Sequence, residues 1–173
     1  MTWAAFQPAI TVGEVPDFAK VHGYRITTYR VRIGHTDEFI EARKMLKASY
    51  EKAGVTTAHL GAFVVTQGVT VPTYLVFRPF TSIAEFDSDS ATNATVMAQV
   101  PADSLKKYDK LLETSLVARE TDTYTILPKT SYVPAAFADA DPFWKNSPTV
   151  VAANTKKATV TQAGAPRSSK KKQ

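Results

Sequence analysis

The segment His22–Ile33, with the sequence HGYRITTYRVRI, decides the fold class because its side chains alternate with a period of two. In an extended chain, Tyr24 and Ile26 point to one side of the backbone. Tyr29 and Val31 point to the other side. Enrichment in β-branched and aromatic residues is typical of strands, so the segment predicts a β-strand.

The chain after this strand predicts a helix and two further strands. Gly34 ends the strand, and residues 35–53 carry apolar side chains at helical spacing with charged residues between them. Residues 55–66 and 71–80 are rich in Val, Thr, Tyr and Phe, which predicts two strands joined by a hairpin loop at 67–70. Both faces of the first of these strands are apolar, so we expect it to be covered on both sides.

The second half of the body predicts more helix and a last strand. Residues 82–86 begin with the Ser-x-x-Glu spacing of a capping box, which predicts a short helix. Residues 87–93 are polar and predict a loop. Residues 94–117 predict a longer helix that Pro101 divides. Residues 121–127 predict the fourth strand of the domain.

The resulting order of elements, β-α-β-β-α-β, is that of the ferredoxin-like α+β fold. In that fold four antiparallel strands form one sheet, and the helices lie on one face of it. The opposite face stays open, and an apolar open face calls for a partner. We therefore expect two copies of the chain, or the chain and a sister module, to pair through their open faces into a dimeric α/β barrel.

The charges divide the chain into a nearly neutral body and a basic tail. The net charge is +5 and the pI is near 9.4, but six of the 21 basic residues follow Lys145, where no acidic residue occurs. The chain up to that point holds the other 15 basic residues and all 16 acidic ones. We expect an extended lead-in at residues 1–20, the ferredoxin-like domain at 21–145, and a disordered basic tail at 146–173.

The composition also disfavours several classes of protein. We expect no specific nucleic-acid binding, because the three lysines at 170–172 give only weak, salt-sensitive attraction to an anionic polymer. The absence of cysteine removes disulfides, thiolate metal sites and a cysteine nucleophile. Residues 54–77 are uncharged, but polar and helix-breaking residues recur there every few positions, so we expect no transmembrane segment.

Cofactor motifs and targeting signals are not visible in the sequence. It has no P-loop, GxGxxG, GxSxG or HExxH motif, and the histidines at 22, 35 and 59 lack the spacing of metal ligands. We therefore expect no cofactor and no metal. No basic region followed by an apolar run opens the chain. The sequence as written thus predicts a cytoplasmic protein, or an extracytoplasmic one if a leader has been removed.

Several short segments resemble known proteins. Residues 29–39, YRVRIGHTDEF, resemble the strand–Gly–His–helix transition of dimeric α/β-barrel proteins, such as the antibiotic-biosynthesis-monooxygenase and NIPSNAP-like groups. Four more segments resemble uncharacterised bacterial proteins that carry two such modules in tandem: TTYRVR (27–32), YLVF (74–77), SYVP (131–134) and ADPFW (140–144). The resemblance implies the ferredoxin-like fold, a dimeric barrel and the place of a second module.

The resemblance also implies an activity whose residues this chain lacks. Haem-degrading members of the superfamily have an Asn on the first strand, a Trp on a core strand and a His on the second helix. Here Asn occurs only at 93, 146 and 154, Trp only at 3 and 144, and the predicted second helix has no His. We expect a non-catalytic or small-ligand-binding module. The alternatives are a cofactor-independent monooxygenase or isomerase acting on a small organic substrate, and a structural pairing module.

His59 is the weak candidate for a catalytic residue, because a titratable group is unusual in the middle of a predicted strand. It could act as a general base or contact a ligand. The alternative, which is the commoner situation, is a buried histidine bonded to a nearby Tyr or carboxylate. Tyr24, Tyr74 and Tyr124 lie on three different predicted strands. They either line a ligand cavity with His59, between the sheet and the helices, or fill the core.

The other histidines and the strand arginines have simpler explanations. We expect His35 to cap the helix that follows it and His22 to be exposed at the start of a strand. Arg30 and Arg32 lie on one face of the first strand, where one of them could meet an anionic ligand. Pairing with acids across the sheet or the dimer is the expectation.

Overall fold

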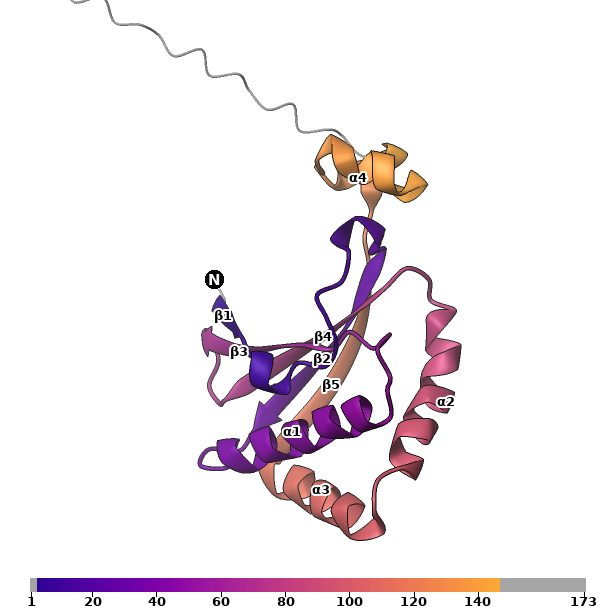
Figure 1. Cartoon of the computed structure of the whole chain (residues 1–173). Helices are drawn as coiled ribbons and strands as arrows, with labels where there is room; N and C mark the ends of the chain where they lie inside the picture. The colour runs from indigo at the N-terminus through magenta and orange to yellow at the C-terminus, as the bar shows by residue number, and fades with distance from the viewer. Residues whose placement is uncertain (1–2, 147–173) are drawn as a thin grey trace, which may run out of the picture.

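The computed structural model describes residues 3–146, in which five strands form one antiparallel sheet accompanied by four α-helices (Figure 1). The strands are β1 (Trp3–Phe6), β2 (Gly23–Val31), β3 (Gly61–Gln67), β4 (Thr73–Phe80) and β5 (Leu116–Thr125). The α-helices are α1 (Thr36–Lys52), α2 (Glu85–Ala98), α3 (Ala102–Ser115) and α4 (Ala135–Ala140). The short 3₁₀ helices are η1 (Pro8–Ile10), η2 (Phe18–Lys20), η3 (Pro128–Thr130) and η4 (Pro142–Asn146). Of the tail predicted at residues 146–173, residues 147–173 lie outside the described part of the chain.

The strands lie in the order β1-β3-β4-β2-β5, each antiparallel to its neighbours. Strand β2 is paired on both sides, with Gly23 opposite Phe80 of β4 and Thr125 of β5. This position explains why β2 carries apolar or β-branched side chains on both faces. The α+β class is confirmed, and so is the strand predicted at 22–33, which is one residue shorter at its start and two at its end.

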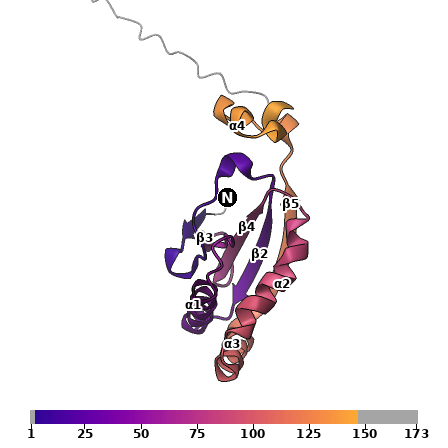
Figure 2. The same ribbon diagram turned by 45° about the vertical axis from the view of Figure 1, so that its right-hand side comes forward.

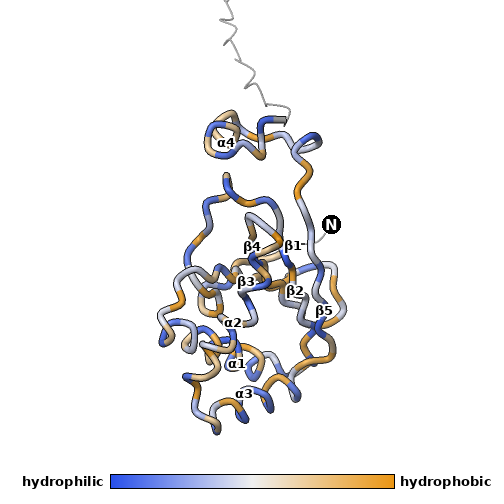
Figure 3. Tube along the Cα trace, turned by 90° about the vertical axis from the view of Figure 1, so that its right-hand side faces the viewer, coloured by the Kyte–Doolittle hydropathy of each residue, from blue (hydrophilic) through white to orange (hydrophobic). Residues whose placement is uncertain are grey.

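Helices α1 and α3 lie side by side on one face of the sheet (Figures 1 and 2). Phe39 of α1 is completely buried, and its ring centre lies 5.3 Å from that of Tyr29 and 4.7 Å from that of Tyr74. Leu112 of α3 packs against the same cluster. Hydrophobic and hydrophilic residues alternate along both helices (Figure 3), as expected where one side of a helix is buried.

The lead-in expected at residues 1–20 contributes to both the sheet and the core. Strand β1 pairs with β3, with Phe6 opposite Phe63. Ile10 is completely buried in the cluster around Phe39, and Val12 is buried in a second cluster nearer the end of α1. These residues extend the sheet by a fifth strand beyond the four that the sequence predicts.

The loop predicted at residues 87–93 is wrong, because α2 runs through it without a break. The capping box that precedes it is present, and Glu85 accepts a hydrogen bond from the backbone of Ser82 at 3.0 Å. Asp89 then contacts Arg78 at 2.6 Å, which ties the middle of α2 to the sheet. Such tertiary contacts outweigh the low helix propensity of the Asp, Ser and Asn residues in this segment.

Two strand boundaries also differ from the prediction. Residues 55–60 precede β3 as a loop, whose apolar side chains pack against the cluster around Tyr50 and not within the sheet. Strand β5 begins at Leu116 and not at residue 121, because the chain pairs with β2 from Val31 onward. The second part of the divided helix, α3, accordingly ends at Ser115.

A small aromatic cluster, which we call the aromatic clamp, joins the C-terminal end of the described chain to the segment directly before β2. The indole Nε1 of Trp144 donates a hydrogen bond of 2.6 Å to the carbonyl oxygen of Ala19. The ring of His22 stacks on Phe143 with 3.9 Å between centres, and its Nε2 lies 2.8 Å from a carboxylate oxygen of Asp141. The prediction that His22 is exposed is therefore wrong, because the C-terminal turn covers its ring.

Asp141 makes the aromatic clamp sensitive to acid. Its pKa lies below the ordinary value of 3.8 because the backbone N–H of Phe143 and the ring of His22 donate hydrogen bonds to its carboxylate. A carboxylate with a depressed pKa stabilises the folded state above its ordinary pKa. This contribution is lost as the pH falls from the ordinary value through the depressed one.

We therefore expect the aromatic clamp to loosen in acid below the ordinary Asp pKa, with exposure of Trp144, which is 3% exposed in the folded chain. The measurement is a red shift of tryptophan fluorescence against pH in a Trp3→Phe background, where Trp144 is the only fluorescent indole. Asp141→Asn should shift the neutral-pH spectrum toward the acid one and flatten the titration. An acid transition of unchanged size in Asp141→Asn would contradict this account.

Candidate functional site

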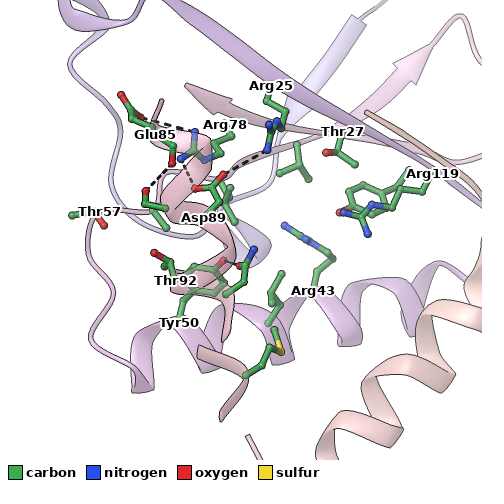
Figure 4. A pocket seen from close by; sticks show the side chains of 18 of the residues that line it. Arg25, Thr27, Arg43, Tyr50, Thr57, Arg78, Glu85, Asp89, Thr92 and Arg119 are labelled. Atoms are coloured by element: carbon green, nitrogen blue, oxygen red, sulfur yellow. Dashed lines mark hydrogen bonds and ion pairs between the residues drawn. The ribbon is translucent and has the colours of Figure 1, made fainter. Parts of the chain in front are cut away.

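A pocket of about 560 Å³ lies between the sheet and helices α1, α2 and α3 (Figure 4). We call it the helix-side pocket. Its lining includes four arginines and three tyrosines: Arg25, Arg43, Arg78, Arg119, Tyr29, Tyr50 and Tyr108. Apolar side chains from α1, α2, α3 and β4 complete the wall. A cavity is thus present between the sheet and the helices, but its polar residues are not those that the sequence suggested.

Arg43 is the deepest cation of the helix-side pocket. Its side chain is 3% exposed, and in Figure 4 it points from α1 toward the sheet. Among the described residues, neither its Nε nor its Nη2 has a hydrogen-bond partner. A guanidinium does not lose its proton in proteins, so the pocket contains a buried positive charge. Burial of a charge without a partner is unfavourable and calls for an explanation.

Arg43 is not among the residues that the sequence singles out, although its position in the chain indicates a buried cation. Phe39, Ala42 and Tyr50 form the buried side of α1. Arg43 follows Phe39 by four positions and precedes Tyr50 by seven, so all three lie on one side of the helix. A charged residue within the apolar side of a helix is therefore the sequence pattern that indicates Arg43.

Two other arginines of the pocket are neutralised by acids of α2. Asp89 lies 2.6 Å from Arg78 and 3.6 Å from Arg25, and Glu85 lies 4.0 Å from Arg78. The ring of Phe86 lies 3.4 Å from the guanidinium carbon of Arg25 and 4.7 Å from that of Arg78. The sheet end of α2 is therefore an ion-pair cluster, in which the Nη1 of Arg78 has no hydrogen-bond partner among the described residues.

Arg119 of β5 is the second cation without an acidic partner. Its guanidinium carbon lies 5.6 Å from the ring centre of Tyr29, and that of Arg43 lies 5.5 Å from the same centre. In residues 3–146 neither arginine forms a salt bridge. Arg119 is exposed whereas Arg43 is buried. The pocket thus has two arginines without an acidic partner among the described residues, Arg119 at the surface and Arg43 in the interior, and both lie near the ring of Tyr29.

Two tyrosines of the pocket, Tyr50 and Tyr108, stay neutral. Burial raises the pKa of Tyr50 and of Tyr108, so both keep their hydroxyl proton at neutral pH. Tyr50 donates its proton to Asn93 of α2 at 2.6 Å. The two hydroxyls therefore add hydrogen-bonding groups to the pocket without adding negative charge.

A second hollow of about 580 Å³, the open-face groove, lies on the opposite face of the sheet. Its lining is almost entirely apolar and comes from β1, β2, β3, β4 and the lead-in. Phe63 lies at its centre, with ring centres 5.4 Å from Phe6 and 5.3 Å from Phe77. The open face that the sequence predicts is thus partly hollowed, and the lead-in forms one wall.

The structure brings some of the predicted ligand-binding residues together and separates another. Tyr24 and His59 both line the open-face groove. Tyr124 lies opposite Tyr24 in the pairing of β2 with β5, and it is 55% exposed. Tyr74 lies on the other face, in the core against Phe39. The four residues therefore do not line one cavity.

His59 is not in the middle of a strand, so that prediction is wrong. It lies in the loop before β3, and its Nδ1 is 2.8 Å from the carbonyl oxygen of Glu14. Because a carbonyl oxygen only accepts, Nδ1 carries a proton and Nε2 is the acceptor of the neutral ring. The hydrogen-bond partner is thus backbone and not the Tyr or carboxylate expected. His59 does not line the helix-side pocket.

Three further residues that the sequence singles out, Arg30, Arg32 and His35, have partners within the fold. Arg30 lies 3.3 Å from Glu120 of β5, which confirms pairing across the sheet. The Nε of Arg32 donates to a backbone oxygen of Thr114 at 3.1 Å. His35 lies directly before α1 but makes no side-chain cap hydrogen bond. These residues therefore stabilise the fold at its surface and leave the two hollows as the candidate sites.

Within residues 3–146, no group of three or more His, Asp or Glu side chains is placed to hold a metal ion. In the same part of the chain no helix combines the length and hydrophobicity needed to span a membrane. Comparison with known proteins finds no matching family model, no similar curated protein and no similar solved structure. We therefore infer function from the geometry of the two hollows.

Proposed function

We propose that this protein is a non-catalytic module that binds a small organic molecule in the helix-side pocket. The observation that carries the proposal is the pocket itself, about 560 Å³ of space that three helices and the sheet enclose but do not fill. This volume falls within the range of small-molecule sites, which combine an apolar wall with a few polar groups.

The charges of the pocket favour binding over acid–base catalysis. Its two carboxylates, Glu85 and Asp89, are both engaged with Arg78. The hydroxyls of Tyr50 and Tyr108 keep their protons. A general base needs an available lone pair, and both carboxylates of the pocket are already held by arginine.

A substitution that fills the pocket tests the proposal. Thr92 lies on the pocket side of α2, so Thr92→Trp should occupy the space, whereas Thr95→Trp places the same ring on the exposed side of the helix. We expect native mass spectrometry of the gently purified wild type and Thr95→Trp to detect a bound small molecule. Thr92→Trp should lose it. Retention by all three proteins would place the ligand elsewhere, and a ligand-free wild type would argue against the proposal.

We further propose that β2-α1-β3-β4-α2-α3-β5 is a ferredoxin-like module of the dimeric α/β-barrel type. The sheet order β3-β4-β2-β5 supports this, because the first and third strands of the module are central and its second and fourth are outer. The helices that line the pocket lie on one face of the sheet. The exposed apolar side chains on the other face, among them Phe6 and Tyr124, support pairing with a second copy or a sister module.

Tyr124→Lys should disrupt this pairing. Tyr124 is 55% exposed on the open face, and a lysine there would have to lose its hydration in a paired state. Ile83→Lys is the matched control, because Ile83 is 59% exposed but lies in the loop before α2. We expect light scattering after size exclusion to report dimers for the wild type and the control, and monomers for Tyr124→Lys. A monomeric wild type would contradict the pairing proposal and would leave the proposal of a ligand in the helix-side pocket unaffected.

A further inference from the structure

We infer that the ligand of the helix-side pocket is an organic anion, a carboxylate on an apolar body, held by Arg43. This inference rests on the proposed function, because it assigns a ligand class to the same pocket. Its basis is the unpaired edge of the buried guanidinium and the distribution of charge around it.

The unpaired edge of Arg43 has the shape of a carboxylate site, which a ligand would reach by displacing the side chains that now bury it. Its Nε and Nη2 have no partner among the described residues, and these two nitrogens lie on the same edge of the guanidinium. Their N–H bonds run parallel, which matches the spacing of the two oxygens of a carboxylate. The side chain is 3% exposed, so a carboxylate bound there would be largely shielded from water and the ion pair strengthened.

No acid within residues 3–146 is placed to satisfy this edge. The carboxylates that line the pocket belong to Glu85 and Asp89, and both lie against arginines of the sheet. The ring of Tyr29, 5.5 Å away, compensates the charge of Arg43 only in part. The compensating anion must therefore come from outside residues 3–146, and a ligand is the simplest source.

Arg119 gives the pocket a charged approach. It is exposed, and its guanidinium lies 5.6 Å from the ring centre of Tyr29. An anion near Arg119 would thus be drawn toward Arg43 along the same ring. Because surface charges are screened by salt, we assign Arg119 a role in attraction and Arg43 the role of anchor.

The rest of the pocket selects the body of the ligand. Leu46, Val76, Met97 and Leu112 come from α1, β4, α2 and α3 and surround the region beyond the guanidinium. These four side chains offer an apolar surface to the ligand, while threonine, serine, asparagine and tyrosine side chains also line the pocket. An alkyl or aromatic chain attached to one carboxylate fits both parts of the pocket.

The test compares three probes that share one alkyl chain: octanoate, octanamide and octyl phosphate. Titration calorimetry on the full chain should give octanoate roughly tenfold or more tighter binding than the neutral amide, as expected for a hydrogen-bonded charge pair. Octanoate should also exceed octyl phosphate, because a phosphate monoester carries more negative charge and loses more hydration beside a single buried cation. Tighter binding of octyl phosphate would support an anionic ligand but overturn the inference that its charged group is a carboxylate.

Variants locate the effect. Arg43→Met roughly keeps the length of the side chain but removes its charge. It should bind octanoate and octanamide with about equal affinity. Lys44→Met, on the exposed side of the same helix, removes an equal charge and should leave the preference intact. Arg119→Gln should weaken octanoate a few-fold at low salt and less at high salt. Octanoate preference that survives Arg43→Met would overturn the inference.

Two outcomes separate this inference from the proposed function. One outcome is that octanoate and octanamide bind equally and that Thr92→Trp abolishes the binding of both. This result would overturn the inference that the ligand is an anion, but the pocket would remain a ligand site. Failure of all three probes to bind at millimolar concentration would count against both.

Discussion

Phe39→Ala is expected to lower the free energy of unfolding by about 3–5 kcal/mol, enough to unfold a large fraction of a marginally stable chain. Phe39 is completely buried and touches the sheet through Tyr29 and Tyr74, at ring distances of 5.3 and 4.7 Å. Removal of its ring leaves a cavity between α1 and the sheet that rigid strands cannot close. Urea unfolding followed by circular dichroism measures the loss.

Phe18→Ala is the control for this prediction. Phe18 is 51% exposed in the short helix η2, so truncation of its ring removes little burial. We expect its effect to stay below about 1 kcal/mol. A loss of less than about 1 kcal/mol for Phe39→Ala itself would mean that α1 does not pack on the sheet through this ring, and the enclosure of the helix-side pocket would fail with it.

The elements with strong periodicity were predictable from the sequence because a local pattern decides them. Strand β2 alternates over nine residues, and α1 keeps its apolar stripe over 17. The helix α2 could not be predicted in the same way. Its residues 87–93 favour a loop locally, and what makes them helical is distant in sequence: Arg78 for Asp89, and Tyr50 for Asn93. Local propensity cannot report such contacts.

The candidate site shows the same division. The sequence suggests a pocket between the sheet and the helices, but it chooses His59 and three tyrosines because those residue types carry chemistry. Three of the four lie on the open face, and Tyr74 lies in the core. The four residues do not share one cavity, because the choice weighed residue types and not their place on an element. Arg43 is conspicuous only when its position within the apolar stripe of α1 is considered.

The last expected result concerns the stability of Arg43→Met in the absence of ligand. Most substitutions of buried residues destabilise a protein. Here we expect the opposite, an increase in the free energy of unfolding of about 1–3 kcal/mol, because methionine removes a desolvated charge whose Nε and Nη2 have no partner in the described chain. The lost attraction to the ring of Tyr29 offsets about 0.5–2 kcal/mol and limits the gain.

Urea unfolding of wild type, Arg43→Met and Lys44→Met, each with and without octanoate, measures this trade. Lys44 is exposed on the same helix, so its loss should change stability by less than about 0.5 kcal/mol. Octanoate should stabilise the wild type and Lys44→Met, and should stabilise Arg43→Met much less. A clear loss of stability in Arg43→Met would mean that the guanidinium is satisfied within the folded protein. Arg43 would then be a structural residue, whereas a gain that octanoate abolishes marks a residue kept for its ligand at the expense of the fold.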